Sequence, residues 1–265
     1  MTEFEELSEG CISAIISRTT PADAGRLSVV SKTFLSAADS DAVWNQFLPS
    51  DSHFIDSIIS HSPSLANVPS KKALYLALSD LPIIIDNDQK SFQLDRKSGK
   101  KCYMLAARSL SIAWGDDRRY WNWISMPNSR FPEVAELLEV WWLDIRGMIN
   151  TLALSPNTQY AAYLVFKMID AEGFQNCPIE LSVGVEGGHS NTKIVCLDPN
   201  VEVEGMQHNR AVGLQRPSVR SDGWLEIEIG EFFNSGLEDE VQMNVKETNN
   251  WKRGLFLEGI EVRPK

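Results

Sequence analysis

The sequence has few of the features that mark secreted, metal-binding or membrane proteins. Its 265 residues include only 4 cysteines and 4 histidines, and the cysteines form no Cys-x-x-Cys pair. Cysteines this sparse, in a chain without a basic and apolar leader, favour reduced thiols and give no zinc-ligand spacing. No apolar run approaches the roughly 20 residues that span a bilayer. We therefore expect no metal, no cofactor and no membrane partner.

Positive charge is also in short supply. The chain has 25 Lys and Arg against 36 Asp and Glu, a formal net charge of −11. Because binding to a phosphate backbone depends on clustered basic residues, we do not expect a nucleic-acid partner. The basic stretch 96–101 is interpreted as a hydrophilic hairpin turn with Ser98 and Gly99 at its tip. No Gly-x-Ser-x-Gly, Walker or Rossmann pattern occurs, so the chain is predicted to be non-catalytic.

The first 50 or so residues instead predict a module of short helices. Ser8 is a candidate N-cap for the first, and Thr20 caps a second that has Pro21 at its first helical position. Helices this short are marginal alone, so the module must pack against the rest of the chain or against a partner. The expected helices cover residues 9–18, a stretch from 21, residues 27–38, and a stretch from 41 that Pro49 ends.

The next segment, 51–87, predicts a semi-rigid helical linker. One short helix carries its apolar residues on a single face, and a second begins after Ser70 and stops at Pro82. The apolar set of the first is Phe54, Ile55, Ile58 and Ile59, and that of the second is Leu74, Ala77, Leu78 and Leu81.

After about residue 83 the apolar period changes to that of strands. In 224–229, Leu225, Ile227 and Ile229 alternate with two glutamates that we expect to face water. Many such strands separated by turn residues predict an antiparallel sandwich or barrel, with 199–223 as a long loop. The expected strands include 92–94, 103–105, 137–145, 160–169, 179–185, 192–197, 224–229 and 255–262.

The N-terminal order of motifs resembles the F-box. The matching stretches are Leu7-Ser8-Glu9, Thr20-Pro21-Ala22-Asp23, Val29-Val30-Ser31-Lys32 and Val43-Trp44, with serine at position 8 where F-boxes usually have proline. The resemblance implies docking to the Skp-type linker subunit of a ubiquitin ligase, and through it to a cullin. A merely structural helical cap is the alternative. The expected contact residues are Leu7, Ile12, Ile15, Ile16, Val30 and Trp44.

The second half resembles the phloem protein 2 family, a plant lectin domain also found in Nictaba-like agglutinins. Motifs that carry the match include Leu110-Ser111-Ile112-Ala113-Trp114, Tyr120-Trp121-Asn122-Trp123 and Trp142-Leu143-Asp144-Ile145-Arg146-Gly147. The resemblance implies a jelly-roll-like sandwich that binds glycans containing N-acetylglucosamine or of the N-acetyllactosamine type. It also implies a carbohydrate site formed by Trp114, Trp121, Glu240 and Glu247.

Such a site is chemically reasonable, because the C–H face of a sugar ring packs on an indole while its hydroxyls bond carboxylates. Structural packing is the alternative for both tryptophans, and 238–240 could equally be a solvated charged turn. Trp142 and Trp224, which lie inside strand patterns, are expected in the core, and Trp141 at a surface or an interface.

Together these observations predict an α+β multidomain protein with an F-box at 1–50, a helical linker at 51–87 and a lectin-like β-sandwich at 88–265. The expected function is a substrate receptor of an SCF-type ubiquitin ligase in plant cytoplasm and nucleus, with a glycan or glycoprotein target. Two alternatives stay open. In one the sandwich reads a protein surface, for instance through the 199–223 loop. In the other the chain is a soluble lectin with a vestigial F-box.

Overall fold

A computed structural model describes residues 7–175, 177–185, 187–188, 190–200 and 213–265. The chain divides into two compact units. The helical unit contains the residues up to Ile85 together with Phe92–Lys101, and the β unit contains Asp86–Ser91 and Cys102–Lys265. The predicted change from helices to an antiparallel β domain is thus confirmed.

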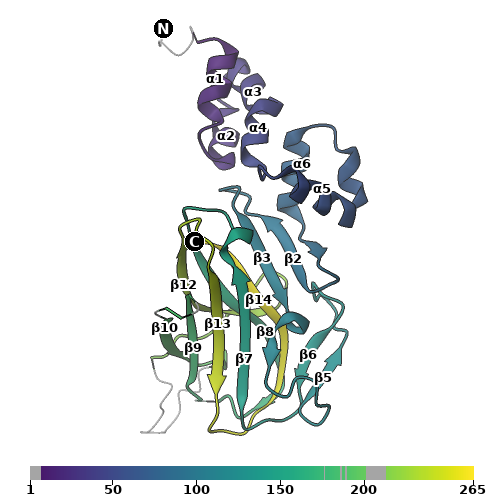
Figure 1. Cartoon of the computed structure of the whole chain (residues 1–265), viewed down its shortest axis with the longest axis vertical. Helices are drawn as coiled ribbons and strands as arrows, with labels where there is room; N and C mark the ends of the chain where they lie inside the picture. The colour runs from purple at the N-terminus through teal and green to yellow at the C-terminus, as the bar shows by residue number, and fades with distance from the viewer. Residues whose placement is uncertain (1–6, 176, 186, 189, 201–212) are drawn as a thin grey trace. The chain divides into compact units, whose positions relative to one another are not determined.

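The helical unit begins with four short helices, as the sequence predicts: α1 (Glu9–Ile16), α2 (Pro21–Leu27), α3 (Lys32–Asp39) and α4 (Asp41–Phe47) (Figure 1). The predicted caps are in place, since the hydroxyl of Ser8 accepts from the amide of Cys11 and that of Thr20 from the amide of Asp23. The third helix starts later than expected, because the hydroxyl of Ser31 caps it by accepting from the amide of Phe34.

The core of these helices is aromatic and aliphatic. Trp44 is buried, and its indole N–H donates to the carbonyl of Ala38 over 2.6 Å. Its ring packs on Phe47 and Tyr75, with centroids 5.5 and 5.1 Å away. Ile12 and Ile16 of α1 are buried. These contacts supply the packing that such short helices lack on their own.

The predicted linker helices are α5 (Ser52–His61) and α6 (Lys71–Asp80), separated by the 3₁₀ turn η2 (Pro63–Asn67). Two short strands follow, β1 (Ile83–Ile85) and β2 (Lys90–Leu94). The predicted turn at 96–101 is confirmed, and it packs within the helical unit. The hydroxyl of Tyr75 donates to the carbonyl of Asp95, and the amide of Ala22 donates to that of Lys97.

The β unit contains two antiparallel sheets (Figure 1). One has the strand order β3-β14-β8-β12-β11, with β6 pairing β14 and β5 pairing β6. Its strands are β3 (Lys101–Ala106), β5 (Trp121–Ile124), β6 (Val134–Leu137), β8 (Thr158–Glu172), β11 (Ser218–Val219), β12 (Leu225–Asn234) and β14 (Arg253–Pro264).

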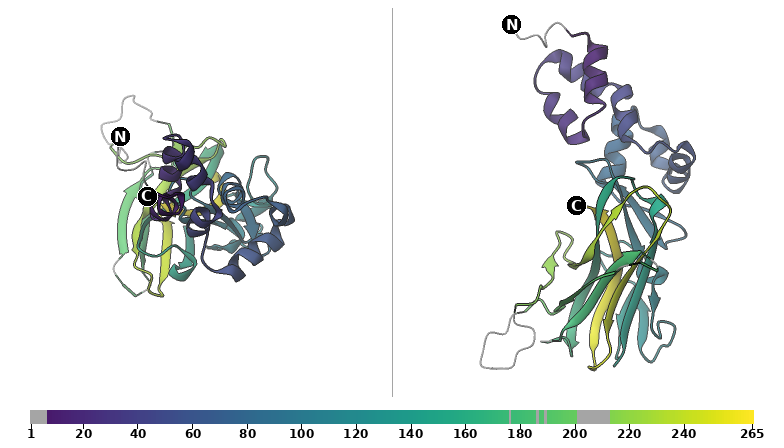
Figure 2. Two further views of the ribbon diagram at one scale, coloured as in Figure 1. Left: turned by 90° about the horizontal axis from the view of Figure 1, so that it is seen from above. Right: turned by 60° about the vertical axis from the view of Figure 1, so that its left-hand side comes forward.

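The other sheet has five strands in the order β10-β9-β13-β7-β4. They are β4 (Ser111–Ile112), β7 (Leu143–Asn150), β9 (Ile179–Val185), β10 (Ser190–Val195) and β13 (Glu240–Glu247), and the 3₁₀ turns η3 (Ala107–Ser109) and η4 (Thr151–Ala153) complete the unit. Figure 2 gives two further views of the strands.

The facing sides of the two sheets make the core of the β unit. A Cβ atom at Gly147 on β7 would lie 3.1 Å from Ile260 on β14, and one at Gly230 on β12 would overlap Val183 on β9. Side chains this close leave no space between the layers, so the sheets pack directly on each other. Of the alternating set in β12, Ile227 and Ile229 are buried as predicted.

One predicted strand is wrong. The stretch 137–145 is not continuous, because β6 ends at Leu137 and β7 begins at Leu143. Between them Val140 and Lys252 exchange both backbone hydrogen bonds, of 2.9 and 2.8 Å. This isolated bridge lies outside the strands of both sheets. As a consequence Trp142 is 45% exposed and does not lie in the core as predicted.

A second region also differs. The charged turn predicted at 238–240 runs directly into β13, which was missed although Val241, Met243 and Val245 alternate as buried residues. The predicted 199–223 loop contains the short strand β11, and its residues 201–212 lie outside the described part. Within the described ranges, no helix is long and apolar enough to cross a membrane.

Candidate functional site

The helical unit exposes a set of aliphatic side chains. Val29 and Val30, in the turn after α2, are 85% and 63% exposed, and Ile15 on α1 and Leu35 on α3 are also exposed. Exposed apolar residues close in one small module are typical of a surface that a partner covers. We call Ile15, Val29, Val30 and Leu35 the aliphatic surface.

The residues of this chain that are predicted to contact the linker subunit fall into two groups. Ile15 and Val30 belong to the aliphatic surface and Leu7 is half-buried, whereas Ile12, Ile16 and Trp44 are core residues. The three buried residues position the helices, and their side chains are not exposed to contact a partner. Val29 and Leu35 were not predicted as contacts, although Val29 precedes Val30 in the motif used for the resemblance.

In the β unit, Trp114 lies in the loop that leaves β4. Its φ of 56° is left-handed, which is uncommon for a bulky residue, and its side chain is half exposed. The indole packs at 5.4 Å from the ring of Tyr120 in the same loop. Hydrogen bonds from Arg119 lower the pKa of Asp117 to about 2, so this loop carries an exposed ion pair.

Trp121 has a different role. It is buried in β5, and its indole N–H donates to the carbonyl of Ala113 over 3.1 Å. Trp123 similarly donates to the carbonyl of Gly115 over 3.0 Å. These two bonds clamp the backbone on either side of Trp114, so Trp121 holds the loop in which the exposed indole lies.

The two predicted glutamates lie at opposite ends of β13. At about 3.4 Å per residue, the seven steps from Glu240 to Glu247 separate them by roughly 24 Å. Glu240 is half-buried and accepts from the side-chain amide of Asn150 over 3.2 Å. The four predicted carbohydrate-binding residues therefore do not converge on one sugar ring.

Glu247 is fully engaged inside the protein. Its carboxylate accepts from the amide of Asn249 at 2.9 Å and from the side-chain amide of Asn250 at 3.0 Å. It also forms an ion pair with Lys252, whose side chain is wholly buried. Burial lowers the pKa of Lys252, as expected for an ammonium removed from water.

Sequence reasoning missed a group of side chains on the outer face of the five-stranded sheet. Arg146 donates to both oxygens of Asp144 at 2.9 and 2.8 Å, and this lowers the pKa of that carboxyl. Trp142 and Lys246 lie beside them, with the ammonium 6.0 Å from the indole centroid. The signal was present in the polar positions of 142–150 and 240–246, which alternate with buried residues.

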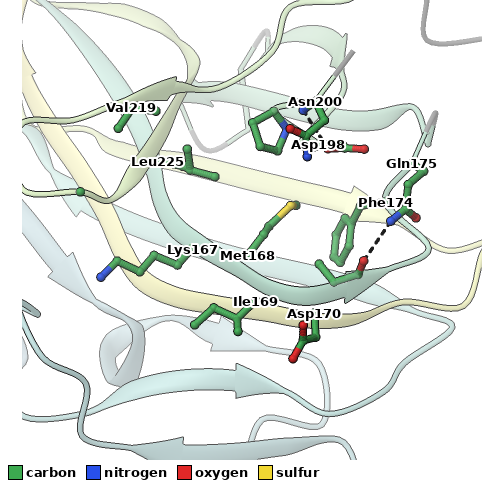
Figure 3. A pocket seen from close by; sticks show the side chains of 13 residues that line it. Lys167, Met168, Ile169, Asp170, Phe174, Gln175, Asp198, Asn200, Val219 and Leu225 are labelled. Carbon is green, nitrogen blue, oxygen red and sulfur yellow. Dashed lines mark hydrogen bonds between the residues drawn. The ribbon is translucent and has the colours of Figure 1, made fainter. Parts of the chain in front are cut away.

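A separate pocket of about 530 Å³ opens at the end of β8, where it meets Leu225 of β12 (Figure 3). Met168 and the buried Phe174 give it apolar walls, and Asp170 and Asp198 add acidic groups. The side-chain amide of Gln175 donates to the carbonyl of Ala171 beside it. The remaining lining residues are Lys167, Ile169, Pro199, Asn200, Val219 and Gly223.

Metal chemistry has no evident place in the described ranges. No group of three or more His, Cys, Asp or Glu side chains there is arranged to hold a metal ion. The candidate surfaces are the aliphatic surface of the helical unit, the polar and aromatic surfaces of the β unit and the pocket at the end of β8.

Comparison with known proteins agrees with this division. The family described as phloem protein 2 matches residues 100–264. An Arabidopsis thaliana protein named F-box protein PP2-B10 is 46% identical, over 98% of this chain and 94% of its own length. Another, F-box protein PP2-B15, is 42% identical over 98% of this chain and 96% of its own.

Among solved structures, TmCBM61 in complex with beta-1,4-galactotriose aligns with 59% of the chain and 87% of its own length, at 13% identity and a TM-score of 0.31. This score is below the usual level for a shared fold, so the likeness carries no weight for the site. The family match and the two relatives decide the assignment: the chain belongs to the phloem protein 2 family and is similar along nearly its whole length to the F-box proteins of the PP2-B type.

Proposed function

We propose that this protein is the substrate-recognition subunit of an SCF-type ubiquitin ligase, with the helical unit acting as an F-box that docks to a Skp-type linker subunit. The aliphatic surface is the observation that carries the proposal, because four exposed aliphatic side chains lie within 21 residues of one helical module. The F-box names of the full-length relatives support it.

The energetics of docking are favourable. Fully burying an aliphatic side chain contributes about 1.5–3 kcal/mol, so covering the exposed parts of the four residues would contribute roughly 4–7 kcal/mol. That gain must offset the loss of free motion on association, so polar contacts at the rim are also needed. The buried Ile12, Ile16 and Trp44 contribute indirectly by keeping the surface rigid.

The test is capture of a purified plant Skp-type linker subunit by the full chain and by Val30→Asp. We expect the substitution to weaken binding strongly, because a carboxylate would have to be desolvated at the interface. Leu81→Asp is the matched control, since Leu81 is an equally exposed aliphatic residue of the same unit that lies beyond α6. Equal binding by wild type and Val30→Asp would contradict the proposal.

For the β unit, we propose a jelly-roll-like lectin domain that captures a glycan or glycoprotein target. Trp114 would stack on a sugar ring, since its indole is half exposed, while Trp121 and Glu247 would hold the framework. Glu240 would supply a carboxylate some distance away. Catalysis would belong to the assembled ligase, which holds the target near the charged ubiquitin carrier in the cytoplasm or nucleus.

A second candidate function is recognition of a protein surface without sugar. The pocket at the end of β8 favours it, because apolar walls with two carboxylates, Asp170 and Asp198, against the one cation of Lys167 suit a side chain that has an apolar stem and a cationic head. Target capture by Trp114→Ala and Asp170→Lys separates the two candidates. If only Trp114→Ala loses target capture, recognition of a glycan is supported. If only Asp170→Lys loses it, recognition of a protein surface is supported. A lectin with a vestigial F-box would bind glycan but no linker subunit.

A further inference from the structure

Most side chains on the outer face of the five-stranded sheet are polar, although the exposed Ile194 and Met148 also lie on it. Because alternate residues of a strand point to the same face, the strand register defines rows across the sheet. In the first row Lys246 of β13 lies between Glu180 of β9 and Asp144 of β7. The next row is Thr192, Ser182, Asn244, Arg146 and Ser111, which come from all five strands in order.

These side chains are held in place by one another. The side-chain amide of Asn244 donates to the hydroxyl of Ser182 over 3.2 Å, and Arg146 donates both of its bonds to Asp144. Side chains ordered before binding lose less conformational freedom when a ligand arrives. The face is therefore pre-organised, and it presents donors and acceptors side by side.

The charges of this face nearly cancel, in contrast to the chain as a whole. Its acidic residues are Glu180, Asp144 and Glu240, and its basic residues are Arg146 and Lys246. Three negative and two positive charges leave a net charge of −1, against −11 for the whole chain. Such a face does not suit a strongly charged peptide or a polyanion, but it suits a neutral ligand rich in hydroxyl groups.

An indole bounds the face at the first row. Trp142 directly precedes β7, its side chain helps to lower the pKa of Asp144, and the ammonium of Lys246 lies 6.0 Å from its ring centroid. It is nevertheless 45% exposed. A partly exposed indole next to fixed polar groups combines the two requirements of sugar binding, an apolar platform and hydroxyl partners.

We infer that this face binds a neutral oligosaccharide, with Trp142 stacking on a sugar ring and with Asn244 and Arg146 bonding hydroxyls along the second row. The inference rests on the proposed glycan binding by the β unit and moves its centre from the Trp114 loop to the sheet. Strands lie about 4.8 Å apart, so the four spacings from β10 to β4 give a row roughly 19 Å long. A row of this length accommodates several sugar rings, and affinity should rise with the length of the oligosaccharide.

The test is calorimetric titration of the full chain with cellohexaose, mannohexaose, chitohexaose and the corresponding monosaccharides. We expect at least one hexasaccharide to bind, more tightly than its monosaccharide. Trp142→Ala and Asn244→Ala should each weaken that binding by about tenfold or more. Trp141→Ala is the matched control, because the neighbouring indole is 66% exposed but precedes the residue that begins the face, and it should change binding less than about twofold.

The outcomes separate this inference from the proposed function. Binding that survives both Trp142→Ala and Asn244→Ala but is lost in Trp114→Ala would overturn the sheet-face site and retain the lectin. Absence of binding to every hexasaccharide would overturn both the sheet-face site and the lectin function proposed for the β unit. Capture of the linker subunit, measured on the same preparations, reports separately on the helical unit and on correct folding.

Discussion

Replacement of Lys252 by methionine is a direct test of how the β unit is held together. Lys252 is fully buried, and its ammonium pairs with Glu247 and donates to the carbonyl of Asn250 over 2.6 Å. Methionine fills a similar volume without charge. The substitution therefore leaves the carboxylate of Glu247 inside the protein without its cation.

The expected loss is large. Removing one partner of a buried ion pair costs about 3–5 kcal/mol, because the remaining charge is uncompensated. Glu247 keeps three hydrogen bonds, from the amides of Asn249 and Asn250 and the side chain of Asn250, which favours the lower end of that range. The double variant Glu247→Gln with Lys252→Met removes both charges, so it should recover about half of the loss or more.

Hydrogen exchange followed by mass spectrometry measures the effect in the β unit alone, through peptides from β13 and β14. We expect their opening free energy to fall by about 3 kcal/mol in Lys252→Met, while peptides from α1 and α4 keep their protection. A change of less than about 1 kcal/mol, or a double variant that is less stable than either single one, would refute the reasoning.

Two further predictions concern buried groups. Trp121→Ala should destabilise the β unit by about 3–5 kcal/mol in urea unfolding, because it removes a buried indole and its bond to Ala113, whereas Trp114→Ala should cost less than about 1 kcal/mol. Equal losses of stability in the two variants would contradict the separate roles of Trp121 and Trp114. Burial raises the pKa of Glu258 despite bonds from Arg130 and Ser129, so the unfolded chain releases this proton at a lower pH than the folded one. The wild type should then lose stability relative to Glu258→Gln as the pH rises between about 4 and 7, and a difference that is flat in pH would count against it.

Much of the fold could be predicted from the sequence because local signals and burial agree there. Ser8, Thr20 and Ser70 each precede an apolar helical stripe, and each caps its helix in the structure. Strands such as 179–185 coincide with β9 because alternation and flanking turn residues point to the same boundaries. In these segments the local pattern and the tertiary packing favour the same structure.

The errors arose where a distant contact overrides the local pattern. The apolar run 137–145 looks like one strand, but the bridge between Val140 and Lys252 breaks it and exposes Trp142. A bridge that joins residues more than a hundred positions apart leaves no local signal. The same holds for Glu247, whose environment depends on Lys252.

The candidate site could be predicted from the sequence only in part, for a related reason. Residue type suggested that indoles and carboxylates contact sugar, yet exposure separates Trp114 from Trp121, and strand length separates Glu240 from Glu247. The rows on the outer face require the register of five strands, which a single sequence does not provide. For the aliphatic surface, the motif identified Ile15 and Val30 but did not distinguish them from the buried Ile12 and Ile16.

The central claim is that this chain is a ligase receptor, and assembly of the complex tests it most directly. The full chain would be mixed with a purified plant Skp-type linker subunit and the N-terminal domain of a cullin, and the mass of the product measured by light scattering during size-exclusion chromatography. The account predicts one ternary complex that contains one copy of each protein. A folded chain that elutes alone, while the linker subunit and the cullin elute together, would contradict it.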